Sequence, residues 1–295
     1  MYPVSVCFGA VRHGARTRYG GQNVGYIGSA WKYVFKNFIF LFLFALIPSY
    51  FFALALDLQS LETIARNLLE LNAEVSFVTV FNCFSFINGS RWPFALVCFA
   101  CLAIFMPMIL AFIEKHMRIG SRSLKGIFGR INYNFLSTFL MLIVAIAVYE
   151  LWALLASGLV YVAVIAFGGA ARTVVAIVVA LGMCLLLSYI FSLFWLWLPC
   201  RQITGYSFAD AMVFANQAIS SKRKKLYLAV MLPYLAGVAL LLLVVGVCSA
   251  FDVIVPVFVF IEIIFILLFL YFCALMFVAY FDAAGEERAD LRKRY

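Results

Sequence analysis

Charged residues are scarce in this chain of 295 residues, where Asp, Glu, Lys and Arg together make up 12% of the positions. An ordinary soluble domain has about 25% charged residues. Hydrophobic residues make up 67% of the sequence, and its mean hydropathy is +1.08. The composition therefore excludes a water-soluble globular protein and leaves little room for a soluble catalytic domain.

Histidine is also rare, since the chain has only His13 and His116. The sequence contains no H-E-x-x-H, no G-x-S-x-G and no phosphate loop. Arg12-His13-Gly14-Ala15-Arg16 matches the R-H-G-x-R core of histidine phosphatases, but those enzymes need a second histidine in a folded soluble pocket. We interpret the match as chance. The sequence favours a non-enzymatic protein, for which we expect no catalytic residue, cofactor or metal site.

Eight cysteines are scattered singly, apart from Cys98 and Cys101. A C-x-x-C pair can be a redox or metal site. This pair lies in an apolar run without a histidine or a further cysteine nearby, so we interpret the two as small core residues. A disulfide framework is not expected.

Six apolar runs are long enough to cross a bilayer, which takes about 20 helical residues. They lie near 37–56, 93–113, 135–158, 174–199, 226–248 and 253–281. The third run continues to Phe167, so this helix is expected to tilt, to break near Ser157-Gly158 or to run along the outer interface. The sequence thus predicts an all-α, polytopic membrane protein with six transmembrane helices.

Lysine and arginine are distributed unevenly between alternate connections. Four segments hold 19 of the 22 residues, namely 1–36, 114–134, 200–225 and 282–295. Positive residues are retained on the cytoplasmic side during insertion. We therefore expect a multi-pass protein of the bacterial inner membrane with both termini in the cytoplasm. The formal charge of +9 suits anionic membrane lipids as partners and gives no support for nucleic-acid binding.

Three predicted cytoplasmic segments share one apolar pattern, at relative positions 0, 3, 4, 7 and 11, which lie on one face of a helix. Its members are Ile27, Ala30, Trp31, Val34 and Phe38, then Leu124, Ile127, Phe128, Ile131 and Phe135, then Phe208, Ala211, Met212, Ala215 and Ile219. Ser123 and Ser207 are the predicted N-caps, and Ser207 with Asp210 has the spacing of a capping box.

We predict from this pattern three parallel repeats, each an interfacial amphipathic helix followed by a membrane hairpin. The alternative is that any helix leading into a membrane has such a face. The predicted organisation has three parts. Residues 1–24 form a flexible basic cytoplasmic tail, residues 25–282 form the six-span domain, and residues 283–295 form a charged cytoplasmic tail. Within the six-span domain the repeats are about 25–114, 121–199 and 205–282.

The one long outer connection is an insertion at residues 57–92. Residues 58–74 have apolar positions at helical spacing and charged positions four residues apart, which predicts a short amphipathic helix. The stretch Val75–Ile87 is expected to dip into the interface or to cap the bundle. The insertion is either a simple lid on the hairpins or a surface for a partner or ligand.

Glu150 and Glu262 are the acidic residues that the predicted spans enclose. A charge in hydrocarbon is costly, so such residues often mark a pathway for protons or ions. The two form the candidate intramembrane polar site. A neutral glutamate hydrogen-bonded between helices is the alternative, and paired acid/base catalysis is a third possibility.

The organisation of residues 25–282, together with Leu198-Pro199 leading into Ser207-Phe208-Ala209-Asp210-Ala211, resembles poorly characterised bacterial six-span families. These families include the membrane region fused to some glycerophosphodiester phosphodiesterases. The resemblance implies a helper or transport-like role at the inner membrane, without a functional residue to carry over.

The leading hypothesis is therefore transport or handling of a lipid-like or small amphiphilic molecule. The alternative is a membrane scaffold or permease-like subunit that docks a cytoplasmic protein through its amphipathic helices. The sequence does not determine an oligomeric state.

Overall fold

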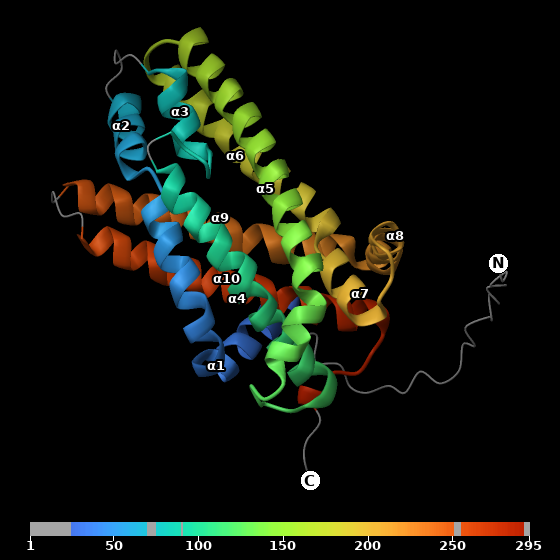
Figure 1. The fold of residues 1–295 in the computed structure, drawn as a ribbon. Coiled ribbons are helices and arrows are strands. Elements are labelled where there is room, and N and C mark those ends of the chain that lie inside the picture. Colours follow the sequence, from blue (N-terminus) through green and yellow to red (C-terminus); the bar gives the residue numbers. More distant parts are fainter. Residues whose placement is uncertain (1–24, 70–74, 90, 251–254, 292–295) are drawn as a thin grey trace.

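The structure is a computed structural model that describes residues 25–69, 75–89, 91–250 and 255–291. Over these residues it is helical and contains no strand (Figure 1). Six of its helical segments are long and apolar enough to cross a membrane, which confirms the predicted number of spans. The predicted tail at 1–24 lies outside the described residues.

The described part of the chain forms ten α-helices and two short 3-10 turns. In chain order they are α1 (Tyr26–Ala55), α2 (Leu58–Leu69), α3 (Phe77–Phe84), α4 (Trp92–Ile119), α5 (Ile127–Ala166), α6 (Gly169–Phe194), α7 (Trp197–Thr204), α8 (Phe208–Ile219), η1 (Ser220–Lys222), α9 (Arg223–Ala250), α10 (Val255–Ala284) and η2 (Ala289–Leu291).

The spans pack as a closed ring. Helices α1 and α4, α5 and α6, and α9 and α10 form three hairpins of consecutive spans. Helix α4 also packs on α5, and α6 packs on α9, while α10 is the main partner of α1. Contacts therefore pass from each span to the next and return from the last span to the first. The axes of α9 and α10 lie at a large angle to those of the other spans (Figure 1).

The connections between spans gather at two ends of this bundle. Helices α2 and α3 lie at one end with the α5–α6 turn, at the upper left of Figure 1. The start of α1, helices α7 and α8 and the end of α10 lie towards the lower right. Successive spans thus run in alternating directions, as a chain that crosses a membrane six times must.

Large side chains from α4 and α10 fill the core against α1. Phe112, Tyr271 and Phe277 are completely buried. The Tyr271 ring lies against Trp31 of α1, with 4.8 Å between ring centroids, and its hydroxyl donates to the Ala229 carbonyl oxygen at 2.8 Å. This one side chain therefore joins α10 to both α1 and α9.

Helix α5 runs without a break for 40 residues, so the predicted break near Ser157-Gly158 does not occur. At 1.5 Å per residue it is about 60 Å long, twice the hydrocarbon thickness of about 30 Å. The C-terminal part of α5 is partly covered by α3. Val80 of α3 packs with Val160 and Val164 of α5, so the outer insertion covers this part of α5.

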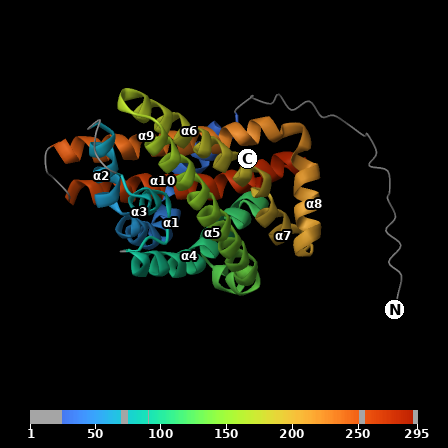
Figure 2. The same cartoon turned by 90° about the horizontal axis from the view of Figure 1, so that it is seen from above.

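The three amphipathic segments differ in the structure. Segment 27–37 is the first part of α1, which changes direction along its length, and segment 124–134 leads directly into α5. Only segment 208–219 is a separate helix, α8, and it lies across the ends of α9 and α10 (Figure 2). The second stripe lies largely among residues whose side chains are not described.

One of the two predicted N-caps is correct. The Ser207 hydroxyl oxygen accepts from the Asp210 backbone N–H at 3.3 Å, so α8 starts with the predicted N-cap, and the same hydroxyl donates to the Asp210 carboxylate. The prediction for Ser123 is wrong. Its hydroxyl accepts from the Lys125 N–H, and α5 begins only after Gly126, whose positive φ of 80° turns the chain.

The predicted fourth span, 174–199, is divided. Helix α6 ends at Phe194, and α7 begins at Trp197. Pro199 lies in the first turn of α7, where its missing N–H costs no helical hydrogen bond. This division allows the chain to turn towards α8.

Candidate functional site

The Glu150 carboxylate holds the outer insertion on α5. One oxygen accepts from the backbone N–H groups of Phe86 and Ile87, at 2.9 and 3.1 Å, and the other accepts from the Ser85 hydroxyl at 2.7 Å. These donors lie in the loop after α3. The predicted site residue therefore joins a span to the insertion, at the end of the bundle where α2 and α3 lie.

A second set of hydrogen bonds fixes both ends of the same insertion. The Asn88 side-chain amide donates to the Ala55 carbonyl oxygen at 2.9 Å, and its side-chain oxygen accepts from the Arg91 N–H at 2.8 Å. Asp57 caps the start of α2 by accepting from the N–H and the hydroxyl of Ser60. The insertion is thus attached to the bundle by hydrogen bonds at both of its ends.

Glu262 has a different environment. It lies in α10 and is partly exposed, and among the described residues it makes no hydrogen bond or ion pair. Its neighbour Ile261 is buried with Ala53 and Val245. The structure gives Glu150 and Glu262 no common partner, so it does not bring the two candidate residues together.

A buried polar cluster that the sequence did not indicate lies at the opposite end, between α1 and α4. Arg122 Nε donates to His116 Nε2 at 3.3 Å, and His116 Nδ1 lies 3.1 Å from the Tyr33 hydroxyl. Because Nε2 accepts from Arg122, Nδ1 carries the proton and donates to Tyr33. His116 and Tyr33 are each only 3% exposed.

The C-terminal segment 285–291 covers this cluster. Arg288 lies over the Tyr33 ring, with its guanidinium carbon 5.9 Å from the ring centroid, and forms a two-pronged ion pair with Asp290. The side chains of Arg288 and Asp290 are 10% and 6% exposed, and η2 packs on α4. This part of the predicted tail is therefore packed against the bundle, whereas residues 292–295 are outside the described residues.

Asp282 joins three elements at the same end. It accepts a hydrogen bond from the Tyr26 hydroxyl at 2.5 Å and pairs with Lys222 at 2.8 Å. Lys222 also donates to the Asp282 backbone carbonyl oxygen. The start of α1, the turn η1 and the end of α10 thus meet at one carboxylate.

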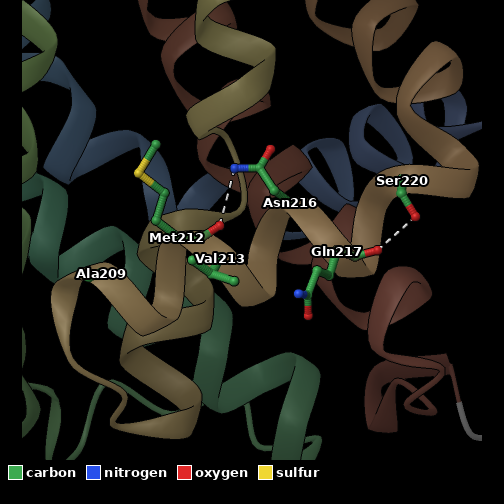
Figure 3. A pocket seen from close by; sticks show the side chains of 6 residues that line it. All are labelled: Ala209, Met212, Val213, Asn216, Gln217 and Ser220. Carbon is green, nitrogen blue, oxygen red and sulfur yellow. Dashed lines mark hydrogen bonds between the residues drawn. The ribbon is translucent and has the colours of Figure 1, made fainter.

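Helix α8 carries a shallow hollow on its outer surface. Its opposite face is buried through Ala211, Ala215 and Ile219 of the predicted apolar pattern, whereas Phe208 of that pattern is 41% exposed and Met212 lines the hollow. The hollow is open and mainly apolar, and the residues lining it are Ala209, Met212, Val213, Asn216, Gln217 and Ser220 (Figure 3). Asn216 is fixed there, since its amide nitrogen donates to the Met212 carbonyl oxygen at 3.2 Å.

A basic run, residues 222–225, directly follows the hollow. Arg223 Nη2 donates to the Asn216 side-chain oxygen at 3.4 Å, and Arg223 Nε is buried without a hydrogen-bond partner among the described residues. Lys224 and Lys225 are exposed. An apolar hollow therefore ends beside a concentration of positive charge.

The described cysteines form no disulfide. All six whose side chains are described are free thiols, and Cys98 donates to the Pro48 carbonyl oxygen in the core. Burial raises the pKa of the Cys83 thiol to about 12, and the Asp57 charge adds to this effect. A thiol with such a pKa stays protonated and unreactive at neutral pH.

In the described part of the chain, no three His, Cys, Asp or Glu side chains are grouped so that they could hold a metal ion. The chain matches no family model, no curated protein and no solved structure. The candidate functional site of this six-span chain is therefore defined by its own geometry, and it is the hollow on α8 with the basic run beside it.

Proposed function

We propose that this chain is a non-enzymatic inner-membrane protein that transports or handles a lipid-like or small amphiphilic molecule. The α8 hollow carries the proposal. Met212 and Val213 offer apolar surface, whereas Asn216 and Gln217 offer amide groups at the same hollow. A molecule with an apolar chain and a polar head matches such a division, because each part meets a surface of its own kind.

Three parallel repeats are part of this proposal. The three hairpins and the ring that returns from α10 to α1 are the arrangement expected of units related by an axis near the membrane normal. Both the stripe at the start of α1 and the stripe in α8 have a buried part, since Ala30 and Ala211 are fully buried. The resemblance to bacterial six-span families would fit the same role.

The exposed apolar residues around α8 support the alternative of a scaffold. Phe208 is 41% exposed and Val213 is 56% exposed, and a cytoplasmic protein could dock on them. A protein that copurifies in equimolar amount through α8, with no lipid on this helix, would favour the scaffold over lipid handling.

The lipid proposal is tested with a phospholipid that carries a photoreactive group in its acyl chain. After irradiation of the protein in native-like membranes, we expect peptide mass spectrometry to find adducts at Met212 and Val213. Val213→Ser should reduce these adducts several-fold, because it removes apolar contact area. Val78→Ser is the matched control, since Val78 is also exposed but lies on α3.

Adducts confined to the lipid-facing sides of the spans, with none on α8, would contradict lipid handling at this site. An equal loss of α8 adducts in Val213→Ser and Val78→Ser would do the same, because it would show a general effect of the substitutions.

We also propose that both termini lie in the cytoplasm, on the evidence of the 19 to 3 distribution of Lys and Arg. Single cysteines are introduced into a variant without native cysteines, and intact cells receive a membrane-impermeant maleimide. We expect labelling at Ser60 and none at Ser221 or Glu286. Labelling at either of the last two positions in intact cells would overturn this topology.

Glu262 stays the candidate for a proton or ion pathway within this proposal. It has no hydrogen-bonding role among the described residues, so a functional role is the simpler reason for a carboxylate at this place in α10. Glu150 has a structural role already, through its contacts with the outer insertion.

A further inference from the structure

We infer that the α8 hollow is selective for an anionic phospholipid, with the lipid phosphate bound by Arg223 and one acyl chain lying along Met212 and Val213. This inference rests on the proposed function and adds the class of molecule and the residue that recognises it. It commits to a lipid as the occupant, because the hollow and the charge adjoin each other.

The position of Arg223 is the first argument. It begins α9, and its Nη2 donates to the side-chain oxygen of Asn216, which lines the hollow. The guanidinium group is thereby held at the edge of the hollow. Among the described residues this is its one hydrogen bond, although a guanidinium has five N–H groups. Because Nε is buried, the remaining Nη donors are the ones left for a ligand with several acceptor oxygens.

The surrounding charge is the second argument. Lys224 and Lys225 are exposed beside Arg223, and no acidic residue lines the hollow. Two acidic side chains at this end already have partners, since Asp210 accepts from the Ser207 hydroxyl and Asp282 pairs with Lys222. The local field is therefore positive, and arginine presents the planar donor group that matches phosphate oxygens.

The apolar lining is the third argument, and it distinguishes a lipid from a free phosphate ion. Most of the hollow is apolar, and it follows α8 from Ser220 past Asn216 to Met212 and Ala209 (Figure 3). A phosphate ion would use only the Arg223 end. A phospholipid would use the charge and the apolar surface together.

The test uses the full chain in nanodiscs with equal amounts of phosphatidylglycerol and phosphatidylcholine, and native mass spectrometry counts the lipids retained after the protein is released. We expect retained phosphatidylglycerol to exceed phosphatidylcholine. Arg223→Gln should reduce this preference about tenfold, the loss expected when a charge-assisted hydrogen bond is removed. Arg223→Lys should keep part of the preference, because it keeps the charge and loses the planar donor group.

Arg118→Gln is the matched control, because Arg118 is an exposed arginine of α4 that pairs with Glu114. It should leave the preference unchanged. Thermal unfolding of each variant shows whether it is folded. Added inorganic phosphate should not displace the retained lipid, and displacement by phosphate alone would overturn the assignment to a lipid.

The two proposals fail in different ways. If Arg223→Gln keeps the full preference while Val213→Ser still reduces retention of both lipids, this inference is overturned and lipid handling at α8 stands. If neither variant changes the retention of either lipid, both proposals are overturned. If Arg118→Gln lowers the preference as much as Arg223→Gln, the preference arises from total charge and this inference is overturned.

Discussion

Replacing Tyr271 with alanine is expected to lower the free energy of unfolding by about 3–5 kcal/mol, the range for removing a large buried aromatic side chain. Tyr271 is completely buried, packs on Trp31 and donates to the Ala229 carbonyl oxygen. The alanine variant loses all of these contacts and leaves a cavity between three spans. Unfolding by SDS titration from mild detergent, followed by tryptophan fluorescence, measures the change.

Tyr271→Phe separates packing from hydrogen bonding. It keeps the ring and loses only the hydroxyl, so we expect a cost of about 0.5–1.5 kcal/mol. Leu243→Ala is the control for a span residue outside the core, because Leu243 is 61% exposed on α9. Similar costs for Tyr271→Ala and Leu243→Ala would contradict the packing of α10 between α1 and α9.

Replacing Glu150 with alanine is expected to release the loop after α3 and to cost about 2–3 kcal/mol, because backbone and hydroxyl donors lose their acceptor. The direct readout is hydrogen exchange at the amides of Phe86 and Ile87, which donate to this carboxylate. We expect these amides to exchange at least about tenfold faster in the variant, as an opening that becomes 1.4 kcal/mol easier is tenfold more frequent.

Glu262→Ala is the matched control for this experiment. Glu262 is also a glutamate within a span, but it has no hydrogen bond among the described residues. Its replacement should leave exchange at Phe86 and Ile87 unchanged. Unchanged exchange in Glu150→Ala, with the protein folded, would show that the carboxylate does not hold the outer insertion.

Local patterns in the sequence predicted the parts of the fold that depend on neighbouring residues. Apolar runs identified the six spans, and the stripe beginning at Phe208 identified α8 and its buried face. The cap at Ser207 was predictable because its partner is three residues away. The cap at Ser123 was not, because Gly126 adopts a positive φ and delays the start of α5.

The hydrogen bonds of Glu150 and His116 join residues far apart in the chain, and no local sequence pattern predicts them. Glu150 meets its partners across about 64 positions, and His116 meets Tyr33 across 83. The available signal for His116 was the polar run at the end of the apolar helix α4, which carries Glu114, Lys115 and His116. The contact of Arg223 with Asn216 was not predicted, because the charge pattern indicates topology and not the partners of individual basic residues.

The closing contact between α1 and α10 affects how the protein is made. Helix α1 is synthesised before the other described helices, yet its main partner begins about 200 residues after α1 ends. At a synthesis rate of about 5–20 residues per second, α1 waits roughly 10–40 s for that partner. During this interval, α1 side chains that contact α10 in the finished protein, such as Trp31 against Tyr271, lie without this partner. Chains that stop before α10 therefore leave part of the α1 surface uncovered, a feature by which membrane quality control can distinguish them from finished ones.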